Sequence, residues 1–100
     1  MLKYRIKENS FFARIAARKL KSRRAAIVFG HTIHLCGATK EEFLENQRWL
    51  RHELKHIEQF QHYGFTWFIV LYLWESLRKG YRNNKYEIEA REAENTQITH

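Results

Sequence analysis

The sequence contains no proline, only four glycines and a single cysteine among its 100 residues. Proline and glycine are the residues that most often interrupt helices and strands, so their scarcity favours long, continuous helices over a sandwich of short strands. One thiol excludes an intramolecular disulfide. We expect Cys36 to be a small buried hydrophobic residue, and the alternative is a thiolate that occupies a metal site.

The amino end also lacks an apolar stretch followed by small residues, which argues against a secretory signal peptide and predicts a cytoplasmic protein. A chain of this length, 44% of it hydrophobic, has enough apolar residues for one modest core. We therefore expect residues 1–100 to form a single small domain.

The net charge of +7 is unevenly distributed along the chain. Basic residues crowd the first quarter, at Lys3, Arg5, Lys7, Arg14, Arg18, Lys19, Lys21, Arg23 and Arg24. Apolar residues recur at helical spacing over 10–22, so residues 1–24 are predicted to be a basic helical arm. Such an arm can contact nucleic acid or anionic lipid, or it can be a solvated surface.

Two kinds of regular structure are predicted after the arm. Residues 25–36 are rich in β-branched side chains around Gly30, which indicates two short strands or one strand with a bulge. Thr39 to Glu42 fit a capping box and predict a helix that continues to about Tyr63.

The apolar run 65–74 is too short to span a membrane as a helix, so it predicts a core helix that continues to Lys79. Its aromatic residues, together with the basic arm, leave peripheral membrane contact as an alternative. A last helix is expected from Asn84 to about Asn95, followed by a flexible tail at 96–100. The predicted fold class is mainly α with a short β hairpin or strand (α+β).

The central motif is His52-Glu53-Leu54-Lys55-His56, an H-E-x-x-H sequence inside the predicted long helix. Residues four apart on a helix project from one face, so both imidazoles can bind one zinc ion. Glu53 can then reach a zinc-bound water and act as the general base. The motif supplies two ligands and a base, whereas a zinc site needs a third ligand.

Three residues are candidates for that third ligand. His62 completes the histidine spacing of metzincin proteases and of a family of small metal-dependent endoribonucleases. Those proteins have a glycine where this chain has Gln59, and a continuous helix turns His62 away from the pair. Glu87 and Glu89 are the other candidates, because a carboxylate from the last helix also completes a site. Helical geometry alone does not separate the two glutamates.

These residues resemble the gluzincin metallopeptidases, most closely the one-domain minigluzincins. Residues 52–59 are similar to the H-E-L-x-H-x-x-Q form of compact members, and residues 87–90 are similar to their E-x-x-A motif. The resemblance implies a compact domain in which His52, His56 and Glu87 bind one zinc ion. It also implies that Glu53 is the base in the hydrolysis of a peptide bond.

The resemblance extends to the cleft. Residues 29–35 are similar to the strand at its upper rim, which implies that Ile33, His34 and Leu35 bind a peptide or protein substrate as an added strand. The family motif often continues with aspartate where this chain has Arg91, and this difference predicts weaker support for the zinc-binding histidines.

Two choices stay open at this point. The group that stabilises the oxyanion can be Tyr81, Tyr86 or His34. Besides the peptidase, two other functions fit the sequence: a metal-dependent ribonuclease that uses His52, His56 and His62, although nucleic acid is not the expected partner, or a non-catalytic zinc-binding module at a membrane surface.

Overall fold

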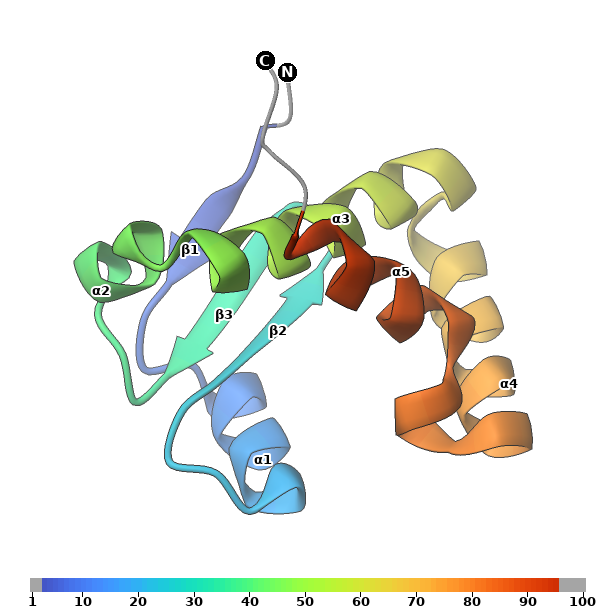
Figure 1. Ribbon diagram of the computed structural model, residues 1–100, viewed down its shortest axis with the longest axis horizontal. Helices are drawn as coiled ribbons and strands as arrows, with labels where there is room; N and C mark the ends of the chain where they lie inside the picture. The colour runs from blue at the N-terminus through green and yellow to red at the C-terminus, as the bar shows by residue number, and fades with distance from the viewer. Residues whose placement is uncertain (1–2, 96–100) are drawn as a thin grey trace.

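The computed structural model describes residues 3–95, so the tail expected at 96–100 lies outside the described residues. Its elements follow in the order β1 (Arg5–Lys7), α1 (Phe11–Leu20), β2 (Ala25–Phe29), β3 (Thr32–Cys36), α2 (Lys40–Glu45), α3 (Gln47–Tyr63), α4 (Phe65–Asn83) and α5 (Lys85–Ala93) (Figure 1). The predicted class is confirmed, because a small sheet is combined with a larger helical part.

The sheet has the strand order β1-β3-β2. β2 and β3 form the predicted hairpin, which turns at Gly30, whose φ of 62° is in the left-handed region that glycine tolerates best.

The strand β1 corrects the sequence-based expectation. Residues 5–7 were expected to be helical, but they pair in parallel with β3. A three-residue strand with one apolar side chain has little local signal, and its partner strand determines its conformation.

The sheet is covered on both faces, as the alternation of side chains along β3 shows. Ile33 and Leu35 are fully buried in the core that contains Phe43 and Ile57. His34 points to the opposite face, where its ring lies 5.7 Å from that of Phe12 in α1. α1 and α3 therefore pack against opposite faces of the sheet, and the basic arm is part of the fold.

The helix predicted from residue 40 to residue 63 is in fact two helices. Thr39 and Glu42 form the expected capping box at the start of α2. Asn46 then leaves the helical conformation, and its side chain accepts a hydrogen bond from the Trp49 backbone N–H at 3.1 Å. Asparagine is a favourable N-cap residue, so Asn46 can end α2 and begin α3 at the same position.

α4 is not the core helix that was expected. Its buried residues are Phe68 and Glu75, and most of its apolar side chains face outward. The helix is broken at Gly80, whose φ of 79° and ψ of 167° are non-helical, so the predicted stop after Lys79 is confirmed. Within residues 3–95, no helix has both the length and the apolarity needed to cross a membrane.

Asn84 connects α4 to α5. Its side-chain nitrogen donates to the Tyr72 carbonyl at 3.0 Å and to Ser76 Oγ at 2.9 Å, and its side-chain oxygen accepts from the Tyr86 N–H at 2.8 Å. The residue is fully buried. This one amide therefore determines how α5 leaves α4.

We expect Asn84→Ala to lower the free energy of unfolding by about 3 kcal/mol, because it leaves the buried Tyr86 N–H without an acceptor and removes a fully buried side chain. Urea denaturation followed by circular dichroism measures the change. The neighbouring Asn83 is exposed, so Asn83→Ala is the matched control and should change stability by less than about 0.5 kcal/mol. Equal effects of the two substitutions would show that the connection does not depend on Asn84.

Candidate metal centre

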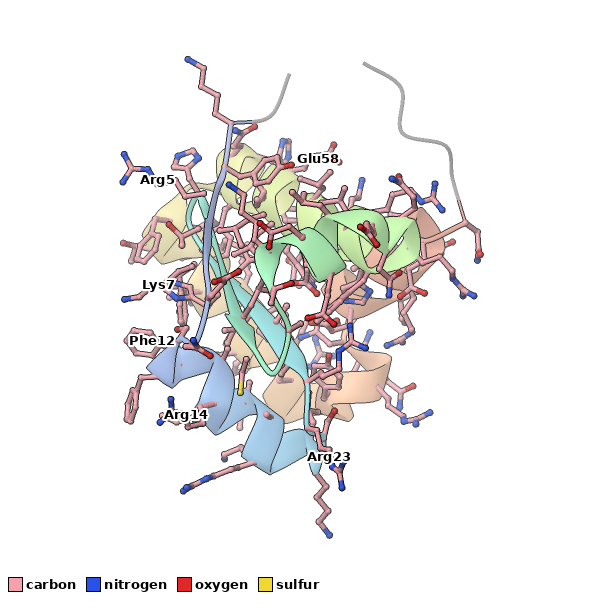
Figure 2. The ribbon with its side chains drawn as sticks, turned by 90° about the vertical axis from the view of Figure 1, so that its left-hand side faces the viewer. Arg5, Lys7, Phe12, Arg14, Arg23 and Glu58 are labelled. Carbon is pink, nitrogen blue, oxygen red and sulfur yellow. The ribbon has the colours of Figure 1, made fainter. Side chains whose placement is uncertain are left out.

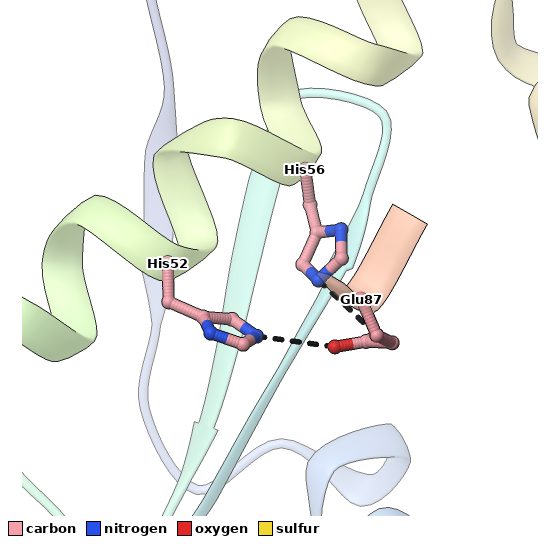
Figure 3. A group of neighbouring side chains, drawn as sticks. All are labelled: His52, His56 and Glu87. Atoms are coloured by element: carbon pink, nitrogen blue, oxygen red, sulfur yellow. Dashed lines mark hydrogen bonds and ion pairs between the residues drawn. The ribbon is translucent and has the colours of Figure 1, made fainter. Parts of the chain in front are cut away.

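The structure brings His52, His56 and Glu87 together. The two histidines lie one turn apart on α3, and Glu87 is in the first turn of α5 (Figure 3). His52 Nε2 lies 3.2 Å from Glu87 Oε1, and His56 Nε2 lies 3.2 Å from Glu87 Oε2. One ligand atom from each residue lies within 4.8 Å of the others, so the group can hold a metal ion.

The position of Glu87 follows from the packing around it. α5 packs closely against α3, with Ala90 fully buried next to Tyr86 at the start of the helix. Tyr72 from α4 donates a hydrogen bond to Glu87 Oε2. The carboxylate therefore contacts side chains from two other helices, and these contacts fix its orientation.

Each histidine is also oriented by its second ring nitrogen. His52 Nδ1 lies 2.7 Å from Glu94 Oε2, and His56 Nδ1 lies 2.9 Å from Gln59 Oε1. Because these partners accept hydrogen bonds, each Nδ1 carries a proton and each Nε2 is directed to Glu87. This is the arrangement by which proteins orient metal-binding histidines.

Glu94 corrects the expectation drawn from Arg91. The sequence predicted weak support for the histidines because Arg91 replaces an aspartate, but Glu94 supplies a carboxylate from the next turn of α5. Glu94 is itself held by Arg48, at 3.4 Å from its Oε1, and by Arg51, which donates to its backbone carbonyl at 3.1 Å. Arg91 instead donates to the carbonyl of Arg82.

Gln59 supports the second histidine in a similar way. Its side-chain nitrogen donates to the Tyr86 carbonyl at 3.1 Å and to Glu89 Oε1 at 2.9 Å, and this orients its oxygen to His56. Glu89 is exposed and contacts Gln59. The structure therefore brings Glu87, and not Glu89, to the histidine pair.

The charges in the group favour a bound cation. Burial by itself lowers the pKa of His52, but hydrogen bonds to its two glutamate partners outweigh burial and raise this pKa to about 9. Burial likewise opposes the charged form of His56, whose pKa is nevertheless raised by Glu87. The pKa of Glu87 is far below its usual range because hydrogen bonds from both imidazoles outweigh its burial. Protons on the two Nε2 atoms occupy the place that a divalent cation can take.

Glu53, the candidate general base, is only 5% exposed. It lines the cavity together with His52 and His56. Burial raises the pKa of its carboxyl group to about 7, and the positive charges of the two histidines limit the shift. A carboxyl group with a pKa near neutrality can both accept and return a proton.

A cavity of about 280 Å³ extends from this group. Its polar end is formed by His52, Glu53, His56 and Glu87. The rest of its wall is mainly apolar and comes from four elements: Ala16 and Leu20 of α1, Ala26 to Phe29 of β2, Phe60 of α3, and Phe68, Ile69 and Leu73 of α4. The candidate metal centre therefore lines a mainly apolar cavity.

Of the three candidates for the oxyanion-stabilising group, only Tyr81 lines the cavity. Burial and the charge of Glu87 raise the pKa of Tyr81, so its hydroxyl keeps its proton at neutral pH. Tyr86 is buried in the core, and His34 contacts Ser10 at 2.8 Å on the α1 side of the sheet.

The expected substrate-binding residues Ile33, His34 and Leu35 lie on the central strand of the sheet rather than at an edge. β3 is the central strand of the sheet, paired with β1 and β2, so it has no free edge to which a peptide can add. Ile33 and Leu35 are also fully buried. β2 is the edge strand beside the cavity.

Two other candidate ligands lie outside the group. His62 is exposed in the last turn of α3 and packs against the ring of Tyr63. Cys36 is a half-buried free thiol in β3, so the expectation of a buried residue is met only in part. Neither residue belongs to the cluster found among residues 3–95. The three-histidine set required for the ribonuclease is not assembled.

Sequence reasoning missed Tyr72 and Glu94. Tyr72 is one aromatic residue in a continuous apolar run, and nothing in its neighbourhood marks it as polar-facing. Glu94 carried a signal, because it lies seven residues after Glu87 and therefore on the same face of α5. Burial and the charge of Glu87 raise the pKa of Tyr72, which keeps it a hydrogen-bond donor.

Comparison with known proteins gives no further assignment. The chain has no significant match to a protein-family model, to a curated protein or to a solved structure. The chemistry of the donor set is therefore the basis for interpretation. Two imidazoles and a carboxylate are groups that can together hold a metal ion.

We expect Glu87→Ala to weaken zinc binding by more than about 100-fold, because it removes one of three ligands. Glu89→Ala is the matched control and should change zinc affinity less than about threefold, since Glu89 contacts Gln59 rather than the histidine pair. Competition with a chromogenic chelator measures both affinities. A larger effect at Glu89 would move the ligand to that residue.

We expect Glu94→Gln to weaken zinc binding about 10- to 100-fold, since the weaker acceptor at His52 Nδ1 lowers the basicity of the imidazole. Glu92 is exposed on the same helix, and Glu92→Gln makes the same change of charge away from the histidine. The same competition assay compares them. If both variants bind zinc equally well, Glu94 does not support the site.

Proposed function

We propose that the protein is a zinc-dependent peptidase of the gluzincin type. The proposal rests on one observation: Glu87 faces the Nε2 atoms of His52 and His56 at 3.2 Å, in a cavity that Glu53 also lines. Two histidines, a glutamate ligand and an adjacent carboxylate base are the set that this reaction uses.

The residues divide the chemistry as follows. His52, His56 and Glu87 would hold the zinc ion, which would supply Lewis acidity to the scissile carbonyl and to a water molecule. Glu53 accepts the proton from the attacking water and then donates it to the leaving amine. Tyr81 lines the same cavity, and its hydroxyl can donate a hydrogen bond to the developing oxyanion.

The substrate is proposed to bind along β2. An edge strand has backbone N–H and C=O groups on its free side, and an extended peptide can pair with them. Ala26 to Phe29 line the cavity, so this pairing holds the peptide next to the metal centre. The apolar wall favours apolar side chains at the positions that enter the cavity.

Replacing the base tests the mechanism. We expect Glu53→Gln to retain zinc and to lose about 100- to 10,000-fold in the rate of peptide cleavage, because the amide cannot accept the proton. Mass spectrometry of new amino termini in a complex peptide mixture measures cleavage, and elemental analysis measures zinc. Glu58→Gln, at an exposed position of α3, is the matched control and should cleave at the unaltered rate.

Two results would contradict the proposal. Equal cleavage by Glu53→Gln would remove the general-base role. A zinc-loaded protein that cleaves no peptide in the mixture would instead favour a non-catalytic zinc-binding module.

A further inference from the structure

The outer side of α4 presents a row of apolar side chains that no other part of residues 3–95 covers. Trp67, Val70, Trp74 and Leu77 recur every three or four residues, so they lie on one side of the helix, which we call the α4 face. Trp67 and Trp74 are 58% and 59% exposed, and Leu77 is 84% exposed. The opposite side of α4, with Phe68 and Tyr72, packs against the core. Contiguous exposed apolar surface of this kind is typical of an interaction site.

Apolar surface is also present at the mouth of the cavity. Leu73 of α4 is 56% exposed and Leu20 of α1 is 50% exposed, and both line the cavity. Phe65, which is also exposed, lies at the start of α4. The apolar surface of α4 therefore extends from the outer side of the helix to the cleft, and α1 continues it across the opening.

The exposed charged residues on these two helices are all basic, although Lys79 pairs with the buried Glu75 at 3.8 Å. The sequence contains no acidic residue from residue 9 to residue 40, and Figure 2 shows Arg14 and Arg23 extending outward from the α1 region. At the end of α4, Arg78, Lys79 and Arg82 are exposed. The one acidic residue of α4, Glu75, is buried and accepts a hydrogen bond from the Lys85 N–H at 3.1 Å.

We propose that the α4 face binds an anionic lipid surface. A helix that lies in the plane of a membrane has an apolar side that enters the acyl region and basic residues that contact the headgroups. Tryptophan favours this boundary, because its ring is apolar and its N–H can contact water or headgroups. α4 presents two exposed tryptophans with three basic residues at its carboxyl end.

A second copy of this chain is a poorer occupant of the α4 face. Each copy carries a net charge of +7, so pairing two copies brings together two chains of like charge, which repel each other. A lipid surface with phosphatidylserine has the complementary charge. The inference is independent of peptidase activity, because it involves neither the metal ligands nor Glu53.

Sedimentation with vesicles tests this proposal on the full chain. We expect binding to vesicles of phosphatidylcholine and phosphatidylserine, weaker binding to phosphatidylcholine alone, and a decrease in binding as the salt concentration rises. The double substitution Trp67→Ser and Trp74→Ser should weaken binding to the anionic vesicles at least about tenfold. Both residues are exposed, so the fold should persist, and circular dichroism checks this.

The matched control is Ile88→Ser, which removes an exposed apolar side chain from α5, outside the α4 face. It should bind vesicles as the unaltered protein does. The proposal is overturned if the unaltered protein does not bind anionic vesicles, or if the double variant binds them equally well. It is also overturned if light scattering shows a dimer that the double substitution abolishes and the protein does not bind vesicles. The vesicle assay is repeated with Glu53→Gln, which lacks the general base. Because this variant should bind vesicles as the unaltered protein does, a failure of membrane binding is distinguished from a failure of the peptidase proposal.

Discussion

The contact between the Glu87 carboxylate and the two imidazoles is the interaction on which the centre of this molecule depends. It joins α3 to α5, and Tyr72 extends it to α4. A buried carboxylate is unfavourable unless positive charge and hydrogen bonds compensate for its lost hydration. Here the imidazoles supply both, as protonated groups or as the ligands of a cation. The same atoms therefore stabilise the helical part of the fold and form the candidate metal centre.

The second layer of hydrogen bonds gives this contact its direction. Glu94 and Gln59 hold the outer nitrogens of the two rings, and Asn84 fixes the path by which α5 approaches them. None of these residues faces the cavity. Their effect is to place Nε2 of each histidine against Glu87, so that little reorganisation is needed when a cation replaces the protons.

Local patterns in the sequence predicted much of this structure. The spacing of His52 and His56 places them on one face of a helix, and Thr39 with Glu42 specifies a helix start, because both depend on residues close in sequence. The hairpin around Gly30 is local for the same reason. The sequence also restricted the third ligand to a few residues, and helix packing then separated Glu87 from Glu89.

Features that depend on distant partners were not predictable in this way. Residues 5–7 become a strand only because β3 is available, and the same pairing makes β3 central and β2 the edge. The apolar composition of residues 65–74 indicated burial, but hydrophobicity alone does not reveal which side of a helix has a neighbour. That distinction changes the interpretation of α4 from a core element to a surface element that also provides Tyr72.

The order of the ligands along the chain has a consequence for biosynthesis. His52 and His56 leave the ribosome well before Glu87, and Glu94, which orients the first ring, emerges later still. A nascent chain that ends within α4 has two imidazoles without their carboxylate, so it can hold a metal ion only weakly. Tight metal uptake, and with it any hydrolytic activity, must therefore wait until the final helix has been translated and has docked.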